Sequence, residues 1–75
     1  MIILNLNQVI AMNIKAYRKF NKLSQNDLAK KLNTSRQHIS EIETCKKNVS
    51  ITYLERIARK LEVEPYKLLK NTEEI

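Results

Sequence analysis

Signals for helix starts recur along this chain at intervals that leave room only for short helices. Asn7, Ser24, Ser35 and Ser50 each precede a run with helical apolar spacing, and a side-chain oxygen at such a position accepts a backbone N–H of the first turn. The second run ends near Leu32, so only two residues separate it from the cap at Ser35. This spacing predicts two short helices joined by a tight turn.

The same signals predict an all-α domain of five helices. We expect helices over residues 8–20, 25–32 and 36–44, a fourth after Ser50 whose apolar stripe reaches Leu61, and a short fifth from Pro65. The 75 residues contain no glycine and one proline, which argues against a turn-rich β fold and against a glycine-rich phosphate loop. A chain of this length predicts a single domain, residues 1–75, with a short apolar N-terminal arm.

Positive charge is concentrated in the body of the chain. Residues 1–60 contain 12 Lys and Arg against 4 Asp and Glu, whereas residues 61–75 contain 2 against 4. The sequence pI is about 9.7, which favours a polyanionic partner.

Residues 25–44 have the pattern of a helix-turn-helix unit. Leu28 and Leu32 of the first helix are expected to face Ile39 and Ile42 of the second, and Ala29 lies where the helices cross most closely. With Ile39 and Ile42 turned inward, the outward face of the second helix consists of Arg36, Gln37, Ser40, Glu41 and Thr44.

Three segments in a fixed order carry a family resemblance. They run from Ser24 to Leu32, from Thr34 to Glu43, and from Asn48 to Ile51, the last followed by Leu54, Ile57 and Ala58. At this spacing the chain resembles the Xre/Cro-CI helix-turn-helix regulators, which have a lambda-repressor-like domain. The resemblance covers roughly residues 10–69 and implies a DNA-binding transcription regulator with its DNA-binding domain over residues 8–69.

The resemblance implies DNA contacts and one internal ion pair. Gln25 matches a glutamine that donates to a DNA phosphate and braces the recognition helix, and Arg18 and Glu43 match a pair that forms a salt bridge in many members. Base edges would be faced by Arg36, Gln37, Ser40 and Glu41, with Ser35 at the start of the helix, and phosphates by the loop residues Lys46, Lys47 and Asn48.

The chain departs from the family at four positions where glycine is common. These positions are Lys22, Asn33, Cys45 and Glu62. Asn33 adopts a positive φ easily, whereas Cys or Glu does so rarely. Either the local turns differ from those of the family or some backbone strain is accepted.

Arg36 and Gln37 have side chains suited to reading bases. An arginine can donate two bonds to guanine O6 and N7, and a glutamine can pair with adenine N6 and N7. The alternative is an ordinary solvated first turn, but the helix-turn-helix context favours base contact. Three roles of Glu41 stay open. It could accept a hydrogen bond from cytosine N4, repel phosphate, or hold the side chain of Arg36 or Gln37 in position. Solvated positions are expected for Lys30, Lys31, Arg56, Arg59 and Lys60.

Other chemistry lacks the residues it needs. Cys45 and His38 are the single cysteine and histidine, whereas zinc needs about four ligands, so we expect no metal, no cofactor and no small-molecule ligand. No nucleophile with a base is recognisable, so we do not expect an enzyme. His38 is interpreted as a packing or rim residue, with contact to phosphate as the alternative, and the lone cysteine favours the cytoplasm. The apolar start is too short and too interrupted by asparagine to span a membrane.

One recognition helix reads only a few base pairs, so we expect a homodimer on a two-fold symmetric operator. The dimer surface is expected at Tyr53, Tyr66, Leu69 and Ile75, with the arm residues Ile2, Ile3, Leu4 and Leu6 as an alternative or additional source. The size resembles that of small controller proteins of restriction-modification systems and of Cro-like repressors. The alternative function is an antitoxin or another partner-binding module with the same fold.

Overall fold

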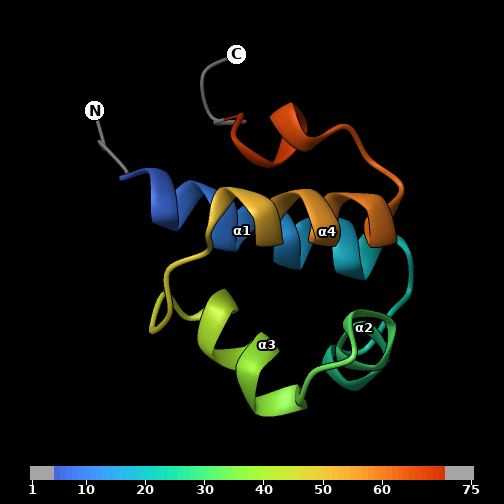
Figure 1. Cartoon of the computed structure of the whole chain (residues 1–75). Coiled ribbons are helices and arrows are strands. Elements are labelled where there is room, and N and C mark those ends of the chain that lie inside the picture. The colour runs from blue at the N-terminus through green and yellow to red at the C-terminus, as the bar shows by residue number, and fades with distance from the viewer. Residues whose placement is uncertain (1–4, 71–75) are drawn as a thin grey trace.

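The computed structural model describes residues 5–70, which form four α-helices and one 3-10 turn without a β-strand (Figure 1). The helices are α1 (Leu6–Phe20), α2 (Gln25–Leu32), α3 (Arg36–Glu43) and α4 (Ile51–Leu61), and the turn is η1 (Pro65–Leu68). The all-α prediction is confirmed. The prediction of a fifth α-helix is wrong, because no side chain caps the start of η1 and the Leu68 carbonyl at its end is bonded to Asn13 of α1.

Side-chain caps determine where the helices begin. Ser24 accepts from the backbone of Asp27 while Asp27 accepts from the backbone of Ser24, a reciprocal pair that lowers the pKa of the Asp27 carboxyl. The predicted cap at Asn7 is wrong. Asn5 caps α1 two residues earlier, in a similar reciprocal pair with Gln8.

Four residues that are not glycine adopt left-handed backbone conformations. Lys22, Asn33, Cys45 and Glu62 have φ angles of 59°, 58°, 64° and 58°. The turns therefore keep the geometry that glycine would favour, and strain is accepted. A residue with a Cβ atom in this region is disfavoured by about 1–2 kcal/mol, and asparagine tolerates it best.

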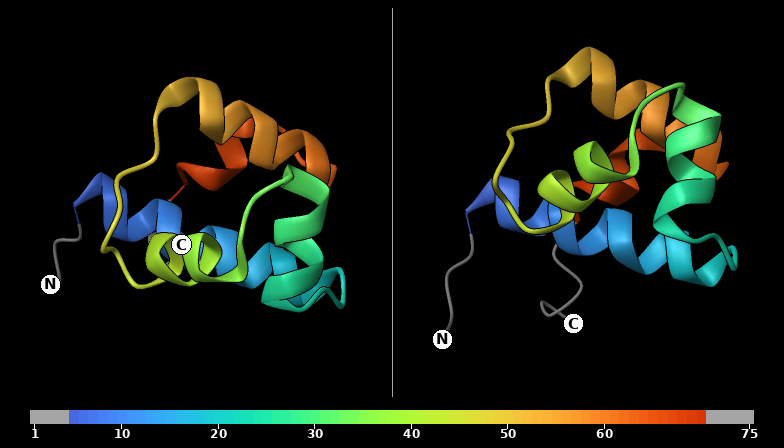
Figure 2. Two further views of the ribbon diagram at one scale, coloured as in Figure 1. Left: turned by 60° about the horizontal axis from the view of Figure 1, so that its bottom comes forward. Right: turned by 90° about the horizontal axis from the view of Figure 1, so that it is seen from below.

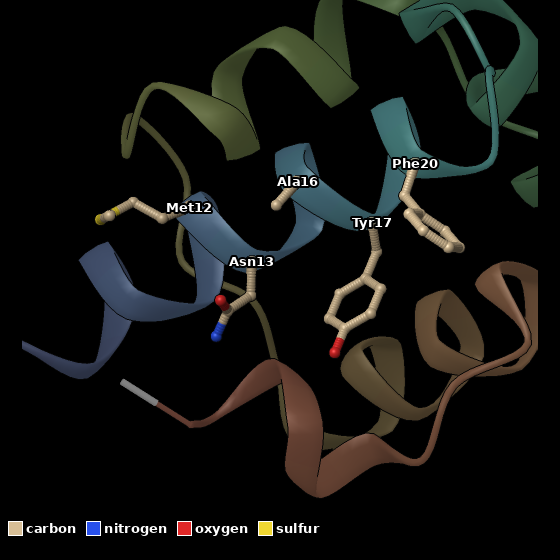
Figure 3. A pocket seen from close by; sticks show the side chains of 5 residues that line it. All are labelled: Met12, Asn13, Ala16, Tyr17 and Phe20. Atoms are coloured by element: carbon tan, nitrogen blue, oxygen red, sulfur yellow. The ribbon is translucent and has the colours of Figure 1, made fainter. Parts of the chain in front are cut away.

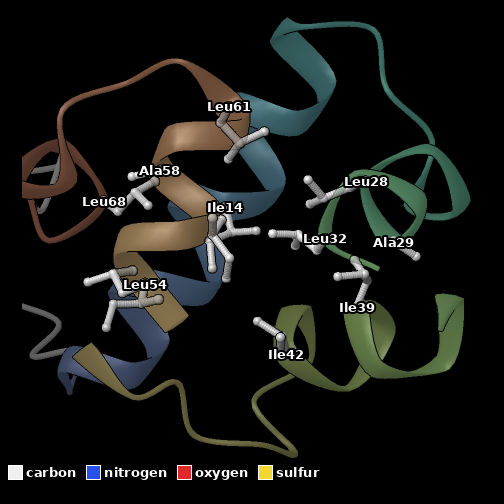
Figure 4. Close-up of a cluster of buried hydrophobic side chains, with 12 residues drawn as sticks. Ile14, Leu28, Ala29, Leu32, Ile39, Ile42, Leu54, Ala58, Leu61 and Leu68 are labelled. Carbon is white, nitrogen blue, oxygen red and sulfur yellow. The ribbon is translucent and has the colours of Figure 1, made fainter. Parts of the chain in front are cut away.

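Aliphatic side chains from every helix meet in one core (Figure 4). The helix-turn-helix residues predicted to face inward are all buried, which confirms that part of the prediction: Leu28, Ala29, Leu32, Ile39 and Ile42. Ile14, Ile57 and Leu68, each at most 1% exposed, extend the core to α1, α4 and η1.

The helix-turn-helix unit and η1 occupy opposite sides of the bundle. In Figure 1, α2 and α3 form the lower edge, α1 and α4 lie above them, and η1 lies at the top. Seen from below, α3 lies at the front of the molecule (Figure 2, right). None of the helices in residues 5–70 is long and apolar enough to cross a membrane.

Candidate nucleic-acid interface

The first turn of α3 is fixed from inside and open to solvent outside. The hydroxyl of Ser35 accepts from the backbone N–H of His38 at 3.1 Å and so caps the helix. Ile39 and Ile42 are 1% and 2% exposed and anchor the opposite face. The outward face therefore presents two exposed residues followed by two half-buried ones, Arg36, Gln37, Ser40 and Glu41.

Thr44 is exposed, as expected for the outward face of the recognition helix, and it is the C-cap residue that follows Glu43, the last residue of α3. The Thr44 hydroxyl donates to the carbonyl of Ser40 at 2.8 Å. The same carbonyl also accepts the backbone N–H of Thr44 at 3.0 Å, so the hydroxyl adds a second bond at the end of α3.

The last residue of α3 is held by a buried ion pair. Nε of Arg18 lies 2.6 Å from Oε2 of Glu43, and the two side chains are 8% and 2% exposed. A second guanidinium nitrogen of Arg18 donates to Oε1 of Glu43 at 3.0 Å, and a third donates to the carbonyl of Leu23 at 2.7 Å. A carboxylate at the negative end of a helix dipole is unfavourable by itself, so Glu43 depends on this arginine. The pair ties α1 to the end of α3.

Gln25 also contacts this ion pair. Its side-chain nitrogen donates to Oε1 of Glu43 at 3.1 Å, which connects the start of α2 to the end of α3. A side-chain amide carries two N–H donors, so this bond leaves one donor for another acceptor. Because Gln25 is only half-buried, its side chain can bond to Glu43 and also contact an acceptor outside the protein.

The loop after α3 carries the residues expected to meet phosphate. Lys46, Lys47 and Asn48 are all exposed. The backbone N–H of Lys46 donates to the carbonyl of Glu41 at 2.8 Å, and Cys45 provides the left-handed turn before it. The backbone of the loop is thus bonded to α3, while its lysine side chains are exposed.

A contact between α4 and the helix-turn-helix unit was missed by the sequence analysis. Arg56 is exposed, as expected of a solvated residue, but its guanidinium also donates to the carbonyl of Leu32, at the end of α2, at 3.0 Å. The guanidinium carbon lies 5.5 Å from the ring centroid of Tyr53, and that ring meets His38 of α3 edge to face at 5.5 Å. An arginine one turn after an aromatic residue on a helix was the available signal.

The residues expected at a dimer surface are not equivalent. Tyr66 and Leu69 are 61% and 41% exposed. Tyr53 is half-buried against the core, and its hydroxyl is buried without a partner among the described residues. Ile75 and the arm residues Ile2, Ile3 and Leu4 lie outside the described residues, whereas Leu6 belongs to α1.

Residues 5–70 hold no group of three or more side chains suited to binding a metal ion. Cys45 is an exposed free thiol, and His38 takes part in packing against Tyr53. The start of α3 and the following loop carry exposed side chains that can form hydrogen bonds, and the positive charges of Arg36, Lys46 and Lys47 are among them.

Two short helices joined by a tight turn, with the second exposed beside a lysine-bearing loop, define a helix-turn-helix domain. The sequence profile of the helix-turn-helix family HTH_3 matches residues 14–68. The chain belongs to this family, and it is a DNA-binding transcription regulator of the Xre/Cro-CI type.

Two relatives with assigned roles are similar over most of the chain. Control protein C.SmaI of Serratia marcescens is 32% identical over 66 residues, which cover 88% of this chain and 79% of that protein. The immunity repressor protein of Bacillus phage phi105 is 40% identical over 55 residues, 73% of this chain but only 38% of the repressor.

Solved structures have the same arrangement of helices. The hypothetical transcription factor NHTF from Neisseria has a TM-score of 0.88 at 30% identity, covering 93% of this chain and 80% of its own. SinR, a master regulator for biofilm formation solved in complex with DNA, has a TM-score of 0.74 at 35% identity, covering 81% of this chain and 98% of its own.

Proposed function

We propose that this regulator reads double-stranded DNA by placing the first turn of α3 in the major groove. The observation that carries this proposal is the contrast within α3. Arg36 and Gln37 are exposed, whereas the Glu43 side chain is buried in its ion pair with Arg18. Residues at the start of the second helix of such a unit are those that reach base edges. The domain that acts in this way corresponds to residues 8–69.

Each proposed contact follows from the position of its side chain. Arg36 and Gln37 read base edges, and Ser40 and Glu41 border them on the same face. Phosphates are met by Lys46, Lys47 and Asn48 in the exposed loop. Gln25 offers its second amide N–H to a phosphate while the first stays on Glu43.

The protein acts as a homodimer on a two-fold symmetric operator. Tyr66 belongs to η1 and Leu69 directly follows it, both side chains are exposed, and η1 lies on the opposite side of the bundle from α3 (Figure 1). A two-fold dimer through this end would present two copies of α3 about 34 Å apart, one turn of DNA. We propose that it works in the cytoplasm, by binding and not by catalysis, and controls its target through its own concentration.

Selection of binding sites from random duplex DNA tests this function. We expect a palindromic consensus with two half-sites one helical turn apart. The affinity for it should fall steeply with salt, because each neutralised phosphate contributes roughly −0.9 to the slope of log K against log salt. A flat salt response, or no enrichment of any sequence, would contradict the proposal.

Sedimentation over micromolar concentrations tests the dimer separately. The variant Leu69→Glu places a charge in the proposed interface and should shift the protein towards monomer, whereas Ile51→Glu, at another exposed apolar residue, should not. A strict monomer that binds single half-sites as tightly as the palindrome would rule out the dimer.

A further inference from the structure

An apolar hollow lies along α1, and the DNA-binding proposal makes no use of it. Its volume is about 290 Å³, and it is lined by Met12, Asn13, Ala16, Tyr17 and Phe20 (Figure 3). Met12 and Phe20 lie at its two ends and are 48% and 81% exposed. Ala16 lies between them, so the centre of the hollow lies close to the helix backbone.

The floor of this hollow is fixed. Asn13 is 5% exposed, and its side-chain amide donates to the carbonyl of Leu68 at 2.9 Å and to that of Lys70 at 2.8 Å. These bonds hold the end of η1 beside α1. Tyr17 points from α1 towards the same C-terminal segment and packs on the core (Figure 3).

The hollow faces away from the DNA-reading helix. Arg18 bonds to Glu43 at the end of α3, and Ala16 precedes Arg18 by two residues. Since successive residues of an α-helix are about 100° apart, Ala16 lies on the opposite face of α1 from Arg18. A partner seated on the hollow would therefore leave the outward face of α3 free.

Positive charge borders the hollow. Lys15 and Lys19 are exposed and follow Met12 and Ala16 by three residues, so they flank the apolar stripe along one side. Lys70 is exposed and follows η1 beside Asn13. Residues 5–26 contain no Asp or Glu, so no acidic side chain on α1 neutralises this border.

We propose that this face of α1, defined by Met12, Ala16 and Phe20 with Lys15 and Lys19, is a docking site for an acidic amphipathic helix of a partner protein. The three apolar residues are spaced one turn apart, which fits a helix that presents apolar anchors at the same spacing. Ala16 allows a close approach, and Met12 adapts to different anchors. Carboxylates beside the anchors of the partner would meet Lys15 and Lys19.

The open shape of the hollow favours a helix over a small ligand. Pockets for drug-sized ligands bury most of the ligand. This hollow instead lies along the exposed side of α1, where Met12 and Phe20 are 48% and 81% exposed, so it accommodates anchoring side chains of a longer partner. This docking goes beyond the DNA-binding function and can be tested without DNA.

A displayed library of helical peptides with randomised surface positions, selected on the full chain, is the direct experiment. We expect selected peptides to share apolar residues one turn apart and to carry more Asp and Glu than Lys and Arg. In amide chemical-shift mapping, the peptide that binds most tightly should shift the amide signals of Met12, Ala16 and Phe20. The amide signals of Arg36 and Gln37 should not shift.

Matched variants distinguish binding at this face of α1 from non-specific binding to other exposed apolar or basic residues. Phe20 and Ile51 are 81% and 79% exposed, so Phe20→Ala and Ile51→Ala remove apolar side chains that are similarly exposed. We expect Phe20→Ala to weaken peptide binding about tenfold and Ile51→Ala to leave it unchanged. Likewise Lys19→Glu should weaken binding, while Lys60→Glu, an equal charge change on α4, should not. Operator binding by Phe20→Ala should stay as in the unsubstituted protein.

Several outcomes would overturn the proposal. Peptides that bind through α3, or that show no excess of acidic residues, would mean general attraction to a basic protein. Dimerisation lost in Phe20→Ala would identify a second copy as the occupant. Binding to vesicles of phosphatidylcholine and phosphatidylserine in equal parts, lost in Phe20→Ala while no peptide is selected, would identify a membrane surface. Nuclear Overhauser contacts between residues 71–75 and Phe20 in the free protein would identify residues 71–75 of the same chain as the occupant of the hollow.

Discussion

The two ends of α3 are built in opposite ways. At its start, Arg36 and Gln37 are exposed and the helix is capped only by the hydroxyl of Ser35. At its end, the Glu43 side chain is 2% exposed and accepts hydrogen bonds from Arg18 and Gln25. One end is available to a ligand, and the other belongs to the interior.

This contrast separates reading from positioning. An exposed side chain can be replaced with little loss of folding free energy, because it makes few contacts inside the protein. Substitutions at the start of α3 can therefore change which DNA sequence is bound without unfolding the domain. A buried charge that loses its partner destabilises the fold strongly. Substitutions at the two ends should therefore affect different measurements.

The largest effect is expected at the anchored end. Arg18→Ala or Glu43→Ala should lower the free energy of unfolding by about 3–5 kcal/mol, because each leaves the other charge buried and uncompensated. Urea denaturation measures this loss. As a control, Glu41→Ala on the half-buried outward face of α3 should lose less than about 1 kcal/mol.

The double variant Arg18→Met with Glu43→Leu sharpens this test. A buried ion pair replaced by apolar residues of similar volume is often as stable as the original. The double variant should therefore lose much less than the sum of the two single losses. A loss equal to that sum would show that the two side chains are not coupled.

A smaller effect is expected where α4 supports the helix-turn-helix unit. Arg56→Gln removes the charged donor to the Leu32 carbonyl and should lower the free energy of unfolding by about 0.5–1.5 kcal/mol, because the Arg56 side chain is exposed and water competes for this bond. Arg59→Gln removes the same charge one turn further along α4, at a residue that is exposed as Arg56 is, and should change the free energy of unfolding by less than about 0.5 kcal/mol. Thermal melts of the two variants should differ accordingly, and equal midpoints would mean that the Leu32 contact contributes nothing.

The smallest effect concerns the left-handed residue that follows α3. Cys45 has a φ of 64°, and glycine adopts this conformation without the Cβ clash. Cys45→Gly should therefore raise the free energy of unfolding by about 0.5–1 kcal/mol, a gain limited by the greater backbone entropy of glycine in the unfolded chain. Asn33 has a φ of 58°, a conformation that asparagine tolerates, so Asn33→Gly should change the free energy of unfolding less than Cys45→Gly does. A loss of stability in Cys45→Gly would contradict the strain argument.

The helix-turn-helix unit could be predicted from the sequence because local signals and packing agree there. Ser24 and Ser35 cap the two helices, and Ile39 and Ile42 are buried as their spacing required. The other end of the chain could not be predicted in the same way. Pro65 permits a helix start, but the hydrogen bonds that hold the end of η1 beside α1 come from Asn13, a residue more than fifty positions away.

The candidate site follows the same division. Exposure of Arg36 and Gln37 follows from helical periodicity alone, which depends only on nearby residues. The bond from Gln25 to Glu43 and the bond from Arg56 to the Leu32 carbonyl depend on how helices are placed relative to one another. Contacts of that kind join residues distant in sequence, so periodicity and capping could not reveal them.

The ratio between operator and random-sequence affinity of the variants at the start of α3 tests the central claim most directly. Arg36→Ala and Gln37→Ala should each weaken binding to the selected operator by about 1–3 kcal/mol, with little change on random duplex DNA or in the thermal midpoint. Lys46→Ala should weaken binding to both DNAs alike. If Arg36→Ala and Gln37→Ala instead lower operator and random-sequence binding equally, the exposed start of α3 does not read DNA.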